Sequence, residues 1–134
     1  MKVTFDTEAI KTISLFQSIT GGNVKDYAET EEEMYFVVSE GEYGLAVGKD
    51  GSKIKHAENV FKKAIKIFEY SPNLEQFVKN LVPEAQNISI KDTSIRVRVK
   101  PGDRAKVIGK GGARVKVMGT FLERLHEIKD FKIM

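Results

Sequence analysis

Two octapeptides of matching pattern, Val47–Ile54 and Ile108–Val115, stand at an offset of 61 residues in this sequence. Each contains an apolar residue, Gly-Lys, a variable residue, a second Gly, two further residues and a second apolar residue. Outside the motif, residues 61 positions apart also share their polarity class across most of the two halves; Phe16, for example, corresponds to Phe77. A fixed period predicts copies of one structural unit. We therefore expect one domain at residues 1–71 and a second at 72–134.

Each copy has the same order of patterns: helix, strand, strand, short helix, glycine loop, long helix, strand. Leu74, Phe77, Val78 and Leu81 recur with helical spacing, and residues 95–99 alternate as a half-buried strand does. This order predicts an α+β fold of two tandem units, each a three-stranded sheet covered by helices on one face. The connector between the copies is too short for free tumbling, so we expect a fixed tandem.

The ends of three elements can also be predicted. Asn73, with Gln76 three residues later, has the pattern of a helix cap. Apolar positions place the first long helix through Ala64. The closing strands match at an offset of 66 rather than 61, so we expect the second long helix to be about a turn and a half longer.

Charge is divided unevenly between the copies. Residues 1–70 hold 9 Lys and Arg against 12 Asp and Glu, and residues 71–134 hold 13 against 7. The excess of positive charge in the second copy fits either an anionic partner or a solvated basic surface.

Without Cys the chain forms neither a disulfide nor a thiolate metal site. Because it has no apolar run of roughly 18 residues and no apolar signal-peptide core at its start, we expect a cytoplasmic protein that contacts no membrane.

The glycine loops, Gly48–Gly51 and Gly109–Gly112, separate a short helix from a long one. Without a Cβ the backbone can turn sharply, and a phosphate can approach its N–H groups. The N-terminus of the following helix favours negative charge at the same place, and Lys49 and Lys110 each add a cation. The pattern therefore predicts a grip on a sugar-phosphate backbone.

Two other phosphate loops are excluded by spacing. A Walker loop would require glycine at Tyr43 or Arg104, and a dinucleotide-binding loop would require glycine at Arg114. Both of those loops also follow a strand, whereas these glycines follow helical segments.

The two octapeptides resemble the signature of the KH domain, a module that binds RNA and single-stranded DNA. The resemblance covers essentially the whole chain, and the helix and strand that precede each core resemble the type II form. Four further segments look like the archaeal NusA-like transcription factors, a family of bare KH pairs: Phe5-Asp6, Val24–Asp26, Gly44–Lys49 and Glu69–Ser71.

The resemblance implies an RNA-binding groove in each copy, with each loop clamping the backbone of about four nucleotides. The loop residues are Gly48, Lys49, Asp50, Gly51, Gly109, Lys110, Gly111 and Gly112. The apolar floor would comprise Leu45, Val47, Ile54, Ala105, Ile108 and Val115. The cations beside the phosphates would be Lys53, Lys55, Arg114 and Lys116. Core packing is the alternative for Val47, Ile54, Ile108 and Val115, and a solvated helix face is the alternative for Lys55 and Lys116.

The copies depart from one another in charge. Asp50 lies inside the first loop, where it offsets Lys49, and Arg104-Ala105-Lys106 stands where the first copy has Gly44-Leu45-Ala46. We therefore expect the second copy to bind RNA more tightly. The acidic run Glu31–Glu33 is most simply a solvated hairpin turn.

No catalytic constellation accompanies the loops. Glu123 and His126 have the spacing of a di-iron ligand pair, but the further ligands of such a site are missing from the sequence. His56 has no partner of ligand type at a useful spacing. We expect a protein without enzymatic activity, cofactor or metal.

We therefore expect a monomer that binds single-stranded RNA, and the resemblance implies a role in transcription termination or antitermination. RNA polymerase is a further candidate partner. The alternatives are a KH protein of ribosome assembly and a protein-interaction scaffold whose loops bind no nucleic acid.

Overall fold

The computed structural model describes residues 6–134, so Phe5 of the family resemblance lies outside the described residues. These residues form two compact units, and the chain passes from one to the other between Ser71 and Pro72. The first unit comprises α1 (Thr7–Thr20), β1 (Val24–Glu29), β2 (Glu33–Val38), α2 (Tyr43–Val47), α3 (Ser52–Phe61) and β3 (Ala64–Glu69). The second comprises α4 (Leu74–Leu81), β4 (Asn87–Lys91), β5 (Ser94–Arg98), α5 (Pro101–Ile108), α6 (Ala113–His126) and β6 (Asp130–Ile133).

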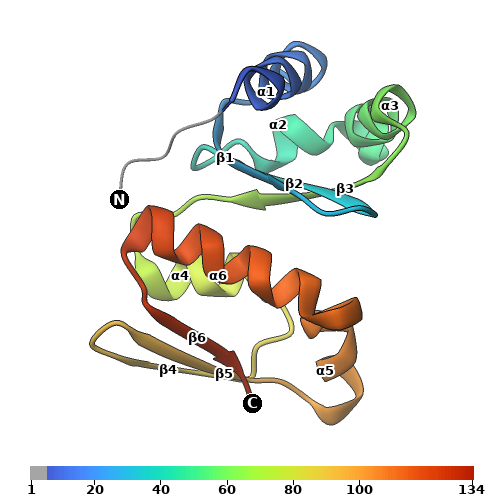
Figure 1. Ribbon diagram of the computed structural model, residues 1–134. Coiled ribbons are helices and arrows are strands. Elements are labelled where there is room, and N and C mark those ends of the chain that lie inside the picture. The colour runs from blue at the N-terminus through green and yellow to red at the C-terminus, as the bar shows by residue number, and fades with distance from the viewer. Residues whose placement is uncertain (1–5) are drawn as a thin grey trace. The chain divides into compact units, whose positions relative to one another are not determined.

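Each unit contains a three-stranded sheet with helices on one face (Figure 1). The first two strands of each sheet form an antiparallel hairpin, and the third strand pairs parallel to the second. A parallel neighbour requires a crossover connection. That crossover consists of α2 and α3 in the first unit and of α5 and α6 in the second, with the glycine loop between the two helices. The predicted α+β fold is confirmed.

The strand register confirms the change of offset at the end of the repeat. Tyr35 pairs with Lys66, and Arg96, its counterpart 61 residues later, pairs with Lys132. α6 has 14 residues and α3 has 10, so most of the additional length lies in the helix. The extension is just over one helical turn, somewhat less than the turn and a half expected.

Local signals set the ends of the helices. The Asn73 side chain accepts a hydrogen bond from the backbone nitrogen of Gln76 at 2.8 Å, which confirms the predicted cap of α4. α3 ends at Phe61 because Lys62 adopts the left-handed conformation, with φ of 59°. Ala64 therefore lies exposed at the start of β3, and its expected place on the helix was wrong.

The core of the first unit lies between its sheet and its helices. Phe16 of α1 stacks on Phe36 of β2 with ring centroids 3.7 Å apart, and Tyr27 of β1 makes a tilted contact with Phe36 at 5.0 Å. Burial of each such side chain contributes roughly 1.5–3 kcal/mol. In the second unit three of the four periodic positions of α4 and the inward positions of β5 are buried, namely Phe77, Val78, Leu81, Ile95 and Val97, whereas Leu74 is half-buried.

The β1–β2 connection carries the acidic run. Glu31 and Glu32 are exposed in the turn, which confirms the predicted hairpin turn for these two residues. Glu33 was wrongly included, because it is half-buried and begins β2, where its side chain accepts a hydrogen bond from the Tyr35 hydroxyl. Within residues 6–134 no helix is both long and apolar enough to cross a membrane.

Because of Tyr27, the stability of the fold should depend on pH in the alkaline range. Its hydroxyl donates a hydrogen bond to Glu29, which also pairs with Lys63. Burial and then the Glu29 hydrogen bond raise the pKa of Tyr27 well above its usual value. An unfolded tyrosine ionises near pH ~10, so above that pH the unfolded state loses a proton that the folded state keeps, and stability falls.

We predict that Tyr27→Phe makes the decline of unfolding free energy above pH ~10 shallower. Urea denaturation at a series of pH values measures this slope. Tyr43→Phe, a change at a tyrosine that is 47% exposed, is the control and should keep the wild-type slope. An unchanged slope in Tyr27→Phe would contradict the prediction.

Candidate nucleic-acid interface

The two glycine loops have the same backbone conformation. Gly48 and Gly109 each have φ of 79° and ψ of 169°, a region that is essentially restricted to glycine. Gly51 and Gly112 then adopt the left-handed conformation, with φ of 73° and 78°. Two loops of different sequence thus make the same turn.

Space as well as conformation excludes a side chain at the first glycine of each loop. A Cβ on Gly48 would lie 2.7 Å from the Cγ of Lys53 and 2.9 Å from its backbone nitrogen. A Cβ on Gly109 would lie 2.7 Å from the Cγ of Arg114. The stems of Lys53 and Arg114 therefore pack directly against the loop backbone.

The charged ends of the same two side chains bond to carbonyl oxygens. Lys53 Nζ donates to the oxygen of Thr20, the last residue of α1, at 3.0 Å. Arg114 Nη1 donates to the oxygen of Lys106 in α5 at 3.1 Å. A cation near helix carbonyls is also favoured by the helix dipole. Both residues, expected from the family resemblance to flank phosphates, support the loop in this structure.

The third loop position differs between the units. Asp50 has φ of 55° and Gly111 has φ of 64°, so both are left-handed. That conformation costs a residue with a Cβ roughly 1 kcal/mol, although Asp tolerates it better than most. Lys55 Nζ donates to the carbonyl oxygen of Asp50 at 3.3 Å. The first loop therefore carries strain and an anion at a position where the second has glycine.

Both long helices begin at the loops. The N-cap residues, Gly51 and Gly112, have no side chain that could bond the first N–H groups of α3 and α6. The N–H groups of Ser52 and Ala113, the first residues of these helices, bond to the carbonyl oxygens of Lys49 and Lys110, so only the N–H groups that follow them in the first turn are left for solvent or a ligand. An anion is the ligand that such a helix end favours, and Lys49 and Lys110 are exposed beside it.

The apolar residues expected under the bases differ in exposure. Leu45 on α2 is 48% exposed, and Ala105 on α5 is also exposed. In the first unit Val47 and Ile54 pack against the core, so core packing accounts for part of their surface. The half-buried members of the set are Val47, Ile54, Ile108 and Val115.

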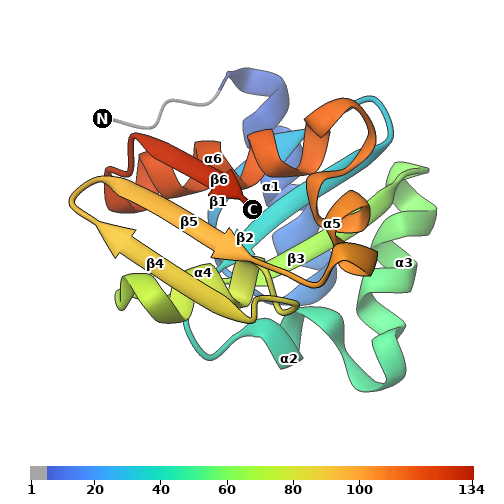
Figure 2. The same ribbon diagram turned by 90° about the horizontal axis from the view of Figure 1, so that it is seen from below.

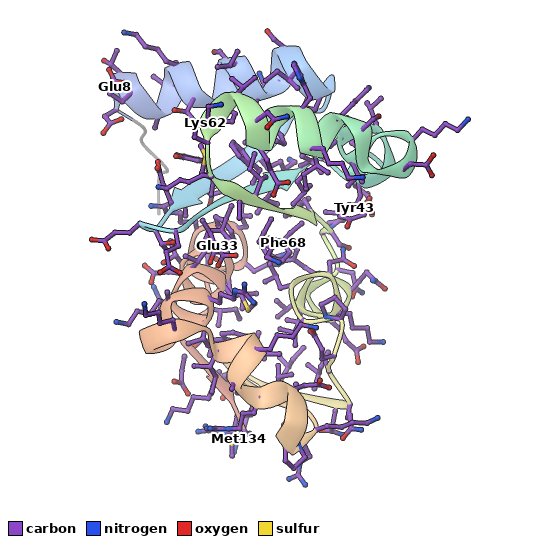
Figure 3. The ribbon with its side chains drawn as sticks, turned by 90° about the vertical axis from the view of Figure 1, so that its right-hand side faces the viewer. Glu8, Glu33, Tyr43, Lys62, Phe68 and Met134 are labelled. Carbon is purple, nitrogen blue, oxygen red and sulfur yellow. The ribbon has the colours of Figure 1, made fainter. Side chains whose placement is uncertain are left out.

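Tyr43 is a candidate that the sequence reasoning missed. It is exposed at the start of α2, where Figure 3 labels it. Arg104, its counterpart 61 residues later, is exposed on α5. Each lies one helical turn before the apolar residue that precedes the glycine loop, so the i, i+4 spacing could have identified both. Aromatic rings and guanidinium planes are the groups on which unpaired bases stack.

One lysine of the second site is held by a carboxylate. Lys106 Nζ lies 3.0 Å from Glu84. Burial alone would raise the pKa of Glu84, but its backbone hydrogen bond and Lys106 outweigh burial and hold the pKa below its usual range. Lys110 and Lys116 are exposed, so cations other than Lys106 face solvent around this loop.

The two residues with di-iron spacing lie in the helical packing of the second unit. The His126 ring lies 5.4 Å from the ring of Phe77, and Glu123 precedes it on α6. Among the residues that the structure describes, no three His, Asp or Glu side chains are grouped so as to hold a metal ion.

Comparison with known proteins decides the family. No family model matches the chain. A "Probable transcription termination protein NusA" of Methanococcus vannielii is 37% identical over the whole chain, which spans 81% of that protein. The chain belongs to the archaeal NusA family. A relative of the same name in Methanocaldococcus jannaschii is 30% identical over 99% of the chain, which spans 76% of that protein.

A solved structure supports the same fold. The crystal structure of APE1850 matches 97% of this chain and 100% of its own, with a TM-score of 0.74 and 33% identity. The described residues thus form two α+β units, each with a three-stranded sheet and helices on one face, as the sequence predicted, and this architecture is consistent with two type II KH domains in tandem.

The first glycine of each loop provides a test of this geometry. Gly48→Ala should lower the free energy of unfolding by about 2 kcal/mol, because alanine must adopt a glycine-only conformation and displace Lys53. Gly44→Ala is the matched control, since nothing lies within 4 Å of a Cβ at that helical position. It should raise stability by up to about 1 kcal/mol. Urea denaturation followed by circular dichroism measures both, and equal effects of the two substitutions would contradict the prediction.

Proposed function

We propose that this chain is a non-enzymatic protein that binds single-stranded RNA and acts in transcription termination or antitermination. One observation carries the RNA part of the proposal: two loops of closely matching backbone conformation each lead into the N-terminus of a long helix that has no side-chain cap. The names of the archaeal relatives support the role in transcription.

The two sides of each loop suit different parts of an RNA strand. The backbone phosphates would lie against the helix N-terminus and the lysine of the loop, where charge-assisted hydrogen bonds are strong. The bases would lie towards α2 or α5, where Tyr43, Leu45 and Arg104 are exposed. Phosphate contacts would supply most of the affinity, and base contacts the preference for sequence.

We also propose that the protein binds RNA polymerase and acts as a monomer in the cytoplasm. Isolation of the tagged chain from archaeal cells tests the partner. Recovery of RNA polymerase subunits in excess over ribosomal particles is the expected result. Enrichment of ribosomal particles instead would favour the ribosome-assembly alternative.

The second loop should be the stronger grip. We predict that Lys110→Asp combined with Gly111→Asp lowers the affinity for single-stranded RNA at least about tenfold, because phosphate contacts dominate binding. The fold should survive, since Asp50 already occupies the equivalent position in the first unit. Fluorescence anisotropy with labelled RNA measures affinity, and circular dichroism checks the fold. Lys49→Asp should cost less, and a larger loss there would reverse the order of the two sites.

The salt dependence of wild-type binding tests the kind of contact. If about four phosphates are neutralised, the logarithm of the affinity should fall against the logarithm of salt concentration with a slope near −3. A slope near zero would contradict a phosphate grip.

Asp50 should limit the first loop. We predict that Asp50→Gly raises RNA affinity several-fold and stabilises the protein by up to about 1 kcal/mol, because it removes both an anion and a strained residue. Asp50→Asn separates the two effects, since Asn removes the charge but keeps the tolerance of the left-handed conformation. Affinity that is unchanged in both variants would show that Asp50 does not face the RNA.

A further inference from the structure

The second sheet has an open face opposite its helices. α4 and α6 cover one face (Figure 1), and the view from below looks onto the other (Figure 2). Residues directly opposite one another on neighbouring strands share a face. The strand pairing therefore places eight residues on the open face: Asn87, Ser89, Lys91, Ser94, Arg96, Arg98, Asp130 and Lys132.

Three cations lie close together on this face. Arg96 is directly opposite Lys132, and Arg98 follows two residues along β5; all three are exposed. Neighbouring strands lie about 4.8 Å apart, and alternate residues of one strand about 6.7 Å apart. Among the eight residues, all of them described, Asp130 is the one anion, and its carboxylate already accepts from Ser94 Oγ at 2.8 Å and lies 3.8 Å from Arg96.

The first unit does not carry this cluster of cations. The counterparts of Arg96 and Arg98 are Tyr35 and Val37, which are buried, and Lys66 alone remains as the counterpart of Lys132. Like charges opposite one another destabilise a sheet. The repulsion between Arg96 and Lys132 thus lowers the stability of the sheet, and a bound anion would offset this loss.

The basic face continues towards the second glycine loop. α5 begins three residues after Arg98, and its eight residues span about 12 Å, a distance that a few nucleotides cover. Lys100 and Arg104 are exposed along this connection. A strand held at the glycine loop could therefore reach the sheet.

We propose that the open face of the second sheet binds the phosphate backbone of RNA that extends beyond the nucleotides held by the second glycine loop. This inference rests on the RNA binding proposed above. RNA fits the face better than an acidic protein does, because the eight strand residues include no aromatic or aliphatic anchor of the kind that protein interfaces need at their centre. The guanidinium groups of Arg96 and Arg98 suit phosphate oxygens.

The test compares a short RNA of about four nucleotides, which one loop can hold, with a long RNA of about thirty. The variant is Arg96→Gln, Arg98→Gln and Lys132→Gln together. Its affinity for the long RNA should fall about tenfold, and its salt slope should become less steep by about 2, the value for three phosphate contacts on a single strand. Its affinity for the short RNA should stay at the wild-type value.

The matched control removes three cations elsewhere: Lys11→Gln, Lys62→Gln and Lys79→Gln. All three are exposed, and Figure 3 labels Lys62 at the end of α3 that is remote from the glycine loop. This variant has the same net charge as the sheet-face variant. It should bind the long RNA nearly as the wild type does.

Three results would overturn the proposal: unchanged long-RNA binding by the sheet-face variant, an equal loss with the short RNA, or an equal loss in the control. Loss of binding to poly-glutamate with long-RNA binding intact would overturn it in favour of an acidic protein. Failure of the proposed function gives a different result, because the wild-type chain would then bind neither RNA at low salt.

Discussion

The structure of both sites depends on one close approach, between the first glycine of each loop and the side chain five residues later. Lys53 and Arg114 run against the backbone of Gly48 and Gly109 at distances that exclude a Cβ. Their charged ends then bond to carbonyl oxygens of neighbouring helices. The turn that leads into the N-terminus of each long helix is therefore held in place by the side chain of Lys53 or Arg114, which packs against the protein. The loop lysines, Lys49 and Lys110, are exposed.

The repeat predicted most of the fold because apolar spacing reports burial directly. The positions of Phe77, Val78 and Leu81 predicted a helix face, and all three are buried. The offset of 66 in the closing strands predicted a longer second helix, and α6 is indeed longer than α3, with 14 residues against 10. The end of α3 was missed because Lys62 adopts a conformation that usually indicates glycine. An ordinary lysine gives no such signal in the sequence.

The candidate site was predictable in its backbone but less so in its side chains. Glycine is needed where the backbone adopts a conformation that other residues avoid, so Gly48 and Gly109 could be identified from their spacing. A long cationic side chain reports only its charge, because its flexible stem leaves the position of its end open. The bond from Lys53 to Thr20 joins residues 33 positions apart and depends on how α1 packs beside the loop. Sequence alone therefore gave no indication that Lys53 supports the loop.

Each glycine loop also lies inside the crossover that joins two parallel strands. In the first unit, β1 and β2 form a hairpin from residues close in sequence, but β3 must return across α2 and α3 before it pairs with β2. Such non-local pairing closes late and slowly in comparison with a hairpin. A chain leaving the ribosome can thus form its first hairpin well before its first loop is held between two packed helices. Because the loop lies inside this crossover, we expect it to take its final position only after β3, which ends at Glu69, has paired with β2, so that the site forms with the last pairing of the sheet.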